Sequence, residues 1–149
     1  MKKRQKMPVV GAVMTSFPHF VDIDESATQM EAMMDQYAIR HLPVQENGKI
    51  VGIVSERDLH HHVKRSSAPE EKNKIRARHI MVPDPYVASF RSPLNEVVRE
   101  MAKRRIGSVI VQRQGKLAGI LSAIDVCRIL SEYLESMFPN GRRGGDSAA

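Results

Sequence analysis

The sequence contains an internal repeat: it aligns with itself without a gap when it is shifted by 67 residues. Identical pairs at this offset occur along both halves, among them Met14 and Met81, Gly48 and Gly115, Gly52 and Gly119, Ser55 and Ser122, and Asp58 and Asp125. A repeat of this kind indicates two copies of one supersecondary unit that stack to bury a shared core. We divide the chain into a basic N-terminal tail, a first unit, a connector, a second unit and a disordered C-terminal tail, at residues 1–9, 10–63, 64–75, 76–137 and 138–149.

The composition narrows the class of protein. Hydrophobic residues make up 42% of the 149 positions, enough for a packed core, and no apolar run approaches the roughly 20 residues that span a bilayer. The single cysteine, Cys127, cannot form an internal disulfide, so we expect a reducing, cytoplasmic compartment. A signal peptide over residues 2–14 is the less favoured interpretation, because the repeat already accounts for most of that segment.

The formal charge of +6 belongs mainly to the two ends of the chain. Lys2, Lys3, Arg4 and Lys6 stand in the first six residues, and the last eight add Arg142 and Arg143. The body between them is nearly neutral, so we expect neither a nucleic-acid surface nor a membrane partner. Nucleic-acid binding through the basic tail and the connector remains an alternative, with an affinity that falls steeply with salt.

The first helix of each copy has a recognisable start. Ser26 is predicted as an N-cap with Gln29 as its capping-box partner, and Ala27, Met30, Met34 and Tyr37 then mark one helical face. In the second copy Ser92 is predicted as the N-cap and Pro93 as the first helical residue. The apolar face continues there with Leu94, Val97, Met101 and Ile106.

Two strands joined by a tight turn follow each of these helices. Asn47-Gly48 and Gln114-Gly115 each separate two short apolar runs, which predicts a hairpin in both copies. A further helix is predicted to begin at Ser55 and at Ser122. The second of these helices is long, and its apolar stripe offers a face to another subunit: Val126, Ile129, Leu130, Tyr133, Leu134 and Met137.

Both copies place a Ser-x-x-Asp string at the predicted strand-to-helix junction. The structural explanation is a helix start, with Ser55 or Ser122 as the N-cap and the carboxylate near the positive helix end. The functional explanation uses the same groups, because a hydroxyl and free N–H groups suit a phosphate and a carboxylate can accept both hydroxyls of a ribose. Gly52 and Gly119 weaken their strands unless something approaches closely. One copy alone would favour the cap, and both explanations stay open.

At this point the sequence resembles a known family, the tandem pair of CBS domains called a Bateman module. The resemblance covers residues 10–137 and is carried by Val13-Met14-Thr15, Ile80-Met81-Val82, His41-Leu42-Pro43-Val44 and the run from Gly48 to Leu59. The second copy is the looser match. It has Ile110 in place of Pro43, and Ala123-Ile124 in place of Glu56-Arg57.

The resemblance implies an α/β fold of two β-α-β-β-α units packed through their sheets about a pseudo-twofold axis. It also implies a regulatory, non-catalytic module that binds an adenosine ligand in clefts between the units: AMP, ADP, ATP, S-adenosylmethionine or NAD. A homodimer and an unidentified target protein would be its partners, and no cofactor is obligatory. The alternative is a ligand-free dimeric platform for protein interaction.

The resemblance also assigns nucleotide-binding roles by position. Asp58 and Asp125 would hold ribose, and Ser55 and Ser122 a ribose or phosphate oxygen. The base would lie against Met14, Thr15, Met81 and Val82, and phosphates against Arg40, His41 and Arg57. Pro43, Ser108 and Ile124 complete the predicted set. Because Gly107 and Ser108 stand where the first copy has Arg40 and His41, we expect the two clefts to differ in affinity.

Metal binding and catalysis find little support. His60, His61 and His62 are adjacent, and adjacent helical residues point in different directions, so they cannot converge on one ion. They suit the C-terminal end of a helix instead. We therefore predict no metal site and no catalytic residues.

Overall fold

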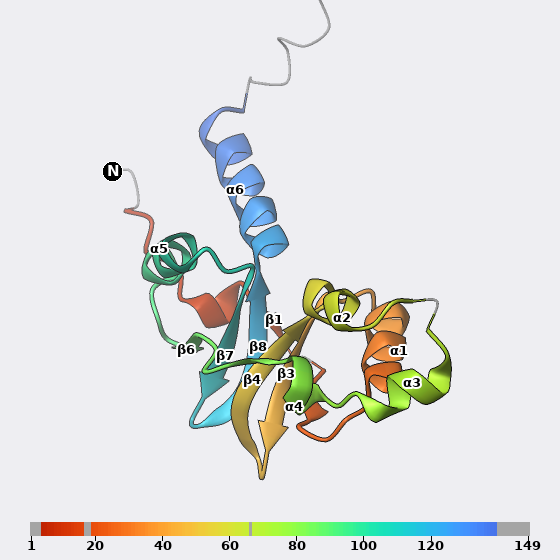
Figure 1. The fold of residues 1–149 in the computed structure, drawn as a ribbon. Coiled ribbons are helices and arrows are strands. Elements are labelled where there is room, and N and C mark those ends of the chain that lie inside the picture. The colour runs from red at the N-terminus through yellow and green to blue at the C-terminus, as the bar shows by residue number, and fades with distance from the viewer. Residues whose placement is uncertain (1–3, 17–18, 66, 140–149) are drawn as a thin grey trace, which may run out of the picture.

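The computed structural model describes residues 4–16, 19–65 and 67–139, which form a mixed α/β fold with two four-stranded sheets (Figure 1). In chain order the elements are η1 (Val10–Ala12), β1 (Thr15–Ser16), β2 (Val21–Asp22), α1 (Ala27–Tyr37), β3 (His41–Glu46), β4 (Lys49–Ser55), α2 (Glu56–His62), α3 (Pro69–Lys74), α4 (Ala77–Ile80), β5 (Val82–Pro83), β6 (Val87–Ser89), α5 (Leu94–Arg104), β7 (Ser108–Arg113), β8 (Lys116–Ser122) and α6 (Ala123–Met137).

The two copies exchange their opening strands. One sheet has the order β2-β3-β4-β5 and the other β1-β8-β7-β6. Strand β1 of the first copy pairs antiparallel with β8 of the second, with Thr15 opposite Ile120. Strand β5 of the second copy pairs in the same way with β4 of the first, with Val82 opposite Ile53. Each sheet is therefore completed by the other copy, which produces the expected pairing of two β-α-β-β-α units with pseudo-twofold symmetry.

Two apolar cores follow the same exchange. The core under the first sheet contains Met30 and Leu42, together with Ile80 from the start of the second copy. The core under the second sheet contains Val97 and Leu121, together with Val10 from the start of the first copy. The predicted helical faces are buried as expected except at two positions. Tyr37 is 42% exposed at the end of α1 and stacks on His19, and Ile106 is half-buried beyond the end of α5.

Both predicted hairpins are present. Asn47 and Gly48 have φ of 51° and 77°, and Gln114 and Gly115 have φ of 52° and 74°. Two consecutive positive φ values are the geometry of the tight turn that matches strand twist. Both hairpins also shift register two residues before the strand ends, so the repeat extends to an irregularity in its sheets.

The predicted helix starts need two corrections. Ser26 is the N-cap of α1 and accepts the Gln29 N–H at 3.2 Å, but the capping box is replaced because the Ser26 N–H donates to Glu25. Ser92 is not an N-cap. Pro93 takes that place and α5 begins at Leu94, because the preceding residues form a strand-like contact with the N-terminal segment in which the Leu94 N–H donates to the carbonyl oxygen of Pro8.

The connector contains a helix that the sequence analysis did not predict. Helix α3 packs beside α1 and carries Lys72, which is only 7% exposed (Figure 1).

The opposite end of the chain is organised differently. Helix α6 projects from the body, and only its base contacts the second core, through Val126 and Ile129 (Figure 1). The predicted C-terminal tail lies outside the described residues from position 140 onward.

Within the described part of the chain, no helix combines the length and the apolar character that crossing a bilayer requires.

Candidate functional site

The two Ser-x-x-Asp strings have matching hydrogen bonds. The Ser55 hydroxyl oxygen accepts the Asp58 N–H at 3.0 Å, and Asp58 Oδ2 accepts the Ser55 N–H at 3.0 Å and its hydroxyl at 2.7 Å. Ser122 and Asp125 make the same three contacts at 3.1, 2.9 and 3.0 Å. Both strings therefore form complete capping boxes, as the structural explanation predicts. The cap uses Oδ2 of each carboxylate and does not involve Oδ1.

The strand glycines next to these junctions are explained by close approach. A Cβ added to Gly52 would lie 2.5 Å from Met81 Sδ, and one added to Gly119 would lie 2.5 Å from the carbonyl oxygen of Thr15. The approaching group is the opening segment of the other copy. The exchange thus brings Met81 and Val82 beside the strand that leads to the first junction, and Met14 and Thr15 beside the strand that leads to the second.

A pocket of about 350 Å³ opens at the first junction. Four residues predicted from the sequence line it: Arg40, His41, Ser55 and Arg57. The structure adds Glu56 and His60 to the lining. These side chains come from the start of β3, the end of β4 and the first turns of α2. Two guanidinium groups and two imidazoles thus surround one carboxylate. A lining of this kind suits an anion, and guanidinium groups are well shaped to bind phosphate oxygens.

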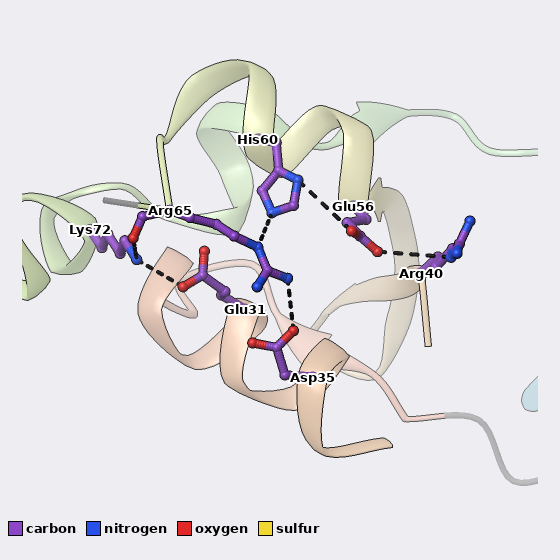
Figure 2. Close-up of polar contacts among 7 residues, drawn as sticks. All are labelled: Glu31, Asp35, Arg40, Glu56, His60, Arg65 and Lys72. Carbon is purple, nitrogen blue, oxygen red and sulfur yellow. Dashed lines mark hydrogen bonds and ion pairs between the residues drawn. The ribbon is translucent and has the colours of Figure 1, made fainter. Parts of the chain in front are cut away.

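Polar contacts, among them ion pairs at Arg40 and Arg65, connect this pocket to the connector (Figure 2). Glu56 lies 4.0 Å from Arg40 and 3.9 Å from His60. The other ring nitrogen of His60 lies 3.3 Å from Arg65 Nε, and Arg65 also binds Asp35 on α1 at 2.9 Å. Arg40 is therefore held in part by Glu56, and an anion that binds Arg40 would compete with that carboxylate.

The sequence analysis missed His60 and Glu56 as pocket residues. His60 was interpreted only as part of a His-rich helix end, although it lies four residues after Glu56. That spacing places both side chains on the same face of α2 as the pocket. The i, i+4 spacing from Glu56 to His60 was the sequence signal that could have identified His60 as a pocket residue.

The second junction carries fewer charged groups than the first, although Arg128 lies 3.3 Å from Asp125 Oδ1 there. At the 67-residue offset, Arg40, His41, Arg57 and His60 correspond to Gly107, Ser108, Ile124 and Cys127. Ser108 is buried at the start of β7 opposite Ser122, and Ile124 is 71% exposed on the first turn of α6. Both junctions share the capping box, so the difference between them is one of charge.

Pro43 differs from the other predicted site residues in its burial. It lies in β3 opposite Ile53 and is fully buried, so its contribution is to the sheet. A smaller hollow, about 210 Å³, lies at the far end of the second sheet beside the Gln114-Gly115 turn and contains none of the predicted site residues. Among the described residues, no three His, Cys, Asp or Glu side chains are grouped closely enough to hold a metal ion.

His41 lies between the two copies. A Cβ on Gly107 would be 3.6 Å from its Nε2, which is an ordinary van der Waals contact, so the ring lies close to the residue that precedes β7. Burial lowers the pKa of His41 below its ordinary value of 6.5, with Asp58 opposing the change and Arg40 adding to it. The imidazole is therefore neutral at pH 7 in the folded protein.

The lowered pKa of His41 predicts acid sensitivity. Below pH 6.5 the unfolded chain takes up a proton at this position that the folded chain binds less readily, so the free energy of unfolding decreases as the pH falls below that value. Chemical denaturation across this pH range should show the decrease in the wild type and a smaller one in His41→Gln. His61→Gln, an exposed change on α2, serves as the control. If the unfolding free energy of His41→Gln decreased with falling pH as steeply as that of the wild type, the prediction would be contradicted.

Comparison with known proteins identifies the class to which this fold belongs. The CBS domain family model matches residues 10–65 and 77–132. The chain belongs to the CBS domain family and contains two CBS domains in tandem. It is 28% identical over 131 residues to inosine-5'-monophosphate dehydrogenase of Staphylococcus epidermidis, covering 85% of this chain and 25% of the enzyme. The chain thus spans about a quarter of the length of that relative.

Two solved structures show the same fold over nearly their whole length. A Vibrio cholerae protein assigned to acetoin utilization, AcuB, is 27% identical with a TM-score of 0.74, and the match covers 91% of this chain and 98% of that one. The CBS domain pair of protein MJ0100, solved with 5-methylthioadenosine and S-adenosyl-L-methionine, is 23% identical with a TM-score of 0.74. That match covers 86% of this chain and 99% of the other.

Proposed function

We propose that this protein is a regulatory sensor that binds an adenosine nucleotide at the first junction. The pocket lined by Arg40, His41, Arg57 and His60 carries the proposal, because it gathers cationic and hydrogen-bonding groups next to Ser55. Membership of the CBS family supports an adenosine ligand, since the related MJ0100 domain pair was solved with two adenosine compounds. The module acts by changing conformation or assembly, without catalysis.

Each predicted residue except Pro43 has a place in this proposal. Asp58 accepts the ribose hydroxyls through Oδ1, the oxygen that the capping box does not use, and Ser55 contributes its hydroxyl. Arg40, His41 and Arg57 bind the phosphates, and His60 joins them. The base lies against the exchanged segment of the second copy, at Met81 and Val82. At the second junction, Met14, Thr15, Ser108, Ser122, Ile124 and Asp125 form a weaker site that takes a ligand with less negative charge.

A calorimetric panel tests the sensor directly. AMP, ADP, ATP, S-adenosylmethionine, NAD and unphosphorylated adenosine are titrated into the full chain. We expect a phosphorylated member to bind, and Asp58→Asn to weaken that binding about tenfold or more, because a charged acceptor of the ribose hydroxyls is lost while the cap keeps an acceptor oxygen. If no compound binds at millimolar concentration, the sensor proposal fails.

A matched pair of variants assigns the phosphate contact. Arg57→Ile introduces the residue that the second copy has at this position and should weaken a phosphorylated ligand about tenfold while leaving adenosine unchanged. Lys49→Gln removes one positive charge at the opposite end of β4 and should change neither affinity. Equal losses in both variants would mean that only overall charge matters.

We also propose that the module forms a homodimer in the cytoplasm and acts on a target protein. The support is the uncovered apolar face of α6, where Leu130 and Tyr133 are each about half exposed. The same observation favours a second candidate function, a ligand-free interaction platform. The calorimetric panel separates the two, because the platform predicts assembly without any nucleotide binding.

A further inference from the structure

His60 lies between the pocket at the first junction and the connector (Figure 2). Its Nε2 accepts the Nε–H of Arg65 at 3.3 Å, and its Nδ1 lies 3.9 Å from Glu56 Oε1. The side chain of His60 is 32% exposed, so most of the ring is enclosed by its neighbours. One ring nitrogen therefore faces a pocket residue, and the other contacts the connector.

The contact with Arg65 determines where the imidazole carries its proton. A guanidinium group has five N–H donors and no acceptor, and it stays protonated in proteins. Nε2 can accept from it only when that nitrogen carries no proton, so the proton of the neutral ring lies on Nδ1. The 3.9 Å from Nδ1 to Glu56 is too long for a hydrogen bond. The ring thus presents to the pocket a donor that none of the described residues accepts at hydrogen-bond distance.

Arg65 is held more firmly than an exposed arginine usually is. Its Nη2 donates to Asp35 Oδ1 at 2.9 Å, and its backbone carbonyl oxygen accepts from Lys72 Nζ at 2.8 Å. Lys72 is buried and also binds Glu31 at 2.8 Å. Glu31 and Asp35 lie four residues apart on one face of α1, so that face holds both the backbone and the guanidinium of Arg65. The guanidinium therefore has a fixed place from which to contact His60.

The second copy lacks the counterparts of these groups. At the 67-residue offset, Glu31, Asp35, His60 and Arg65 correspond to Val98, Ala102, Cys127 and Glu132. The pocket histidine and the groups that support it therefore stand in the first copy alone. Residues that a unit needs only for its folding would be expected in both copies, so this difference favours a role at the first pocket.

We propose that Arg65 is a positioning residue for the ligand site: it holds His60 in the Nδ1–H tautomer, so that the imidazole donates to a phosphate oxygen in the pocket. This inference rests on the proposed function and adds the connector to it as a regulatory element. A phosphate that displaces Glu56 accepts the Nδ1–H and leaves the Arg65 contact in place. Ligand binding and the docking of the connector on α1 therefore favour each other, by the same factor in both directions.

The tautomer is tested on the full chain without nucleotide. Nitrogen-15 NMR spectra distinguish a protonated ring nitrogen from an unprotonated one, and His60→Gln identifies the signals of His60. At about pH 8, where a histidine of ordinary pKa is neutral, we expect Nδ1–H in the wild type and the loss of that preference in Arg65→Met. Lys64→Met removes the neighbouring exposed charge and should leave the tautomer unchanged.

A double-mutant cycle with AMP as the probe tests the effect on binding. Arg65→Met should weaken AMP about three- to tenfold, the value of one hydrogen bond, and leave unphosphorylated adenosine unchanged. In a His60→Ala background the same substitution should change the AMP affinity little, because Arg65 acts through the imidazole. Arg65→Met should fold normally, since the Arg65 side chain is more than half exposed. Lys64→Met is again the control for the lost charge.

Hydrogen exchange tests the reverse direction of the coupling. The Lys72 N–H donates to the carbonyl oxygen of Ala68 within α3, and its exchange reports on how long the connector stays docked. Saturating AMP should slow this exchange about three- to tenfold in the wild type, and it should have no such effect in Arg65→Met.

Three outcomes would overturn the proposal. The first is Nε2–H in the wild type, or an Nδ1–H that survives Arg65→Met, because Arg65 would then not set the tautomer. The second is an equal loss of AMP affinity in Arg65→Met and Lys64→Met, which would mean that only charge matters. The third is full additivity with His60→Ala, which would mean that Arg65 acts by another route. Failure of the proposed function looks different, since no nucleotide of the panel would bind whichever tautomer the spectra show.

Discussion

Replacing Lys72 with Met should cost about 3–5 kcal/mol of unfolding free energy, a large part of the stability of a domain of this size. Lys72 Nζ lies 2.8 Å from Glu31 Oε1 and 2.8 Å from the carbonyl oxygen of Arg65 (Figure 2). The two side chains are only 9% and 18% exposed. Glu31 Oε2 is buried with no hydrogen-bond partner among the described residues, so the ammonium group is the main compensation for this carboxylate. Denaturant unfolding of Lys72→Met measures the loss.

A double variant separates the lost charge from the lost packing. Lys72→Met with Glu31→Leu removes both ions and fills the space with apolar atoms, so it should recover most of the stability that Lys72→Met loses. Arg65→Met, at a pair whose side chains are more than half exposed, should cost less than about 1 kcal/mol. A Lys72→Met loss below 1 kcal/mol, or no recovery in the double variant, would contradict this account of α3.

The second large effect is expected at Gly119. A methyl group there would lie 2.5 Å from the carbonyl oxygen of Thr15 and would also overlap Met14 Sδ. Because Thr15 is held opposite Ile120 in the β1–β8 ladder, its carbonyl cannot move away without breaking that pairing. We therefore expect Gly119→Ala to lower the unfolding free energy by about 2–3 kcal/mol, as overpacked cores do. Thermal and denaturant unfolding give the value.

Gly52→Ala is the matched control, since it occupies the same place in the first copy. Its nearest obstacle is Met81 Sδ, the flexible part of a side chain, and the backbone oxygen of Val82 is farther away, at 3.0 Å. The cost at Gly52 should be smaller than at Gly119. Equal costs would show that the Met side chains, and not the Thr15 carbonyl, set the penalty.

The repeat was sufficient to predict two copies of one unit with most of its helices and turns, because it places the same local signals at the same offset in both halves. The arrangement of the two units came from the resemblance to the CBS domain pair. The turns at Asn47-Gly48 and Gln114-Gly115 and the caps at Ser55 and Ser122 are local features, and each is confirmed. The start of α5 was mispredicted, because the contact that sets it comes from Pro8, more than 80 residues away in the chain.

The candidate site could be predicted only in part. The resemblance assigned Arg40, His41, Ser55 and Arg57 by position, and the pairing of β3 with β4 brings them together. The chain of polar contacts from Glu56 through His60 to Arg65 depends on how the connector folds back onto α1, and no short-range pattern encodes that. The buried Lys72 was likewise hidden, because a lysine in a charged connector is usually solvated.

The exchange of β1 and β5 between the sheets has a consequence for how the chain is made. Strand β1 leaves the ribosome about a hundred residues before its partner β8 begins. The second sheet can therefore be completed only after β8 has been translated, and closing so long a loop is slow. Until then strand β1 and its apolar neighbours have no sheet to pack against, so the opening segment of the first copy depends on the end of the second copy for its burial.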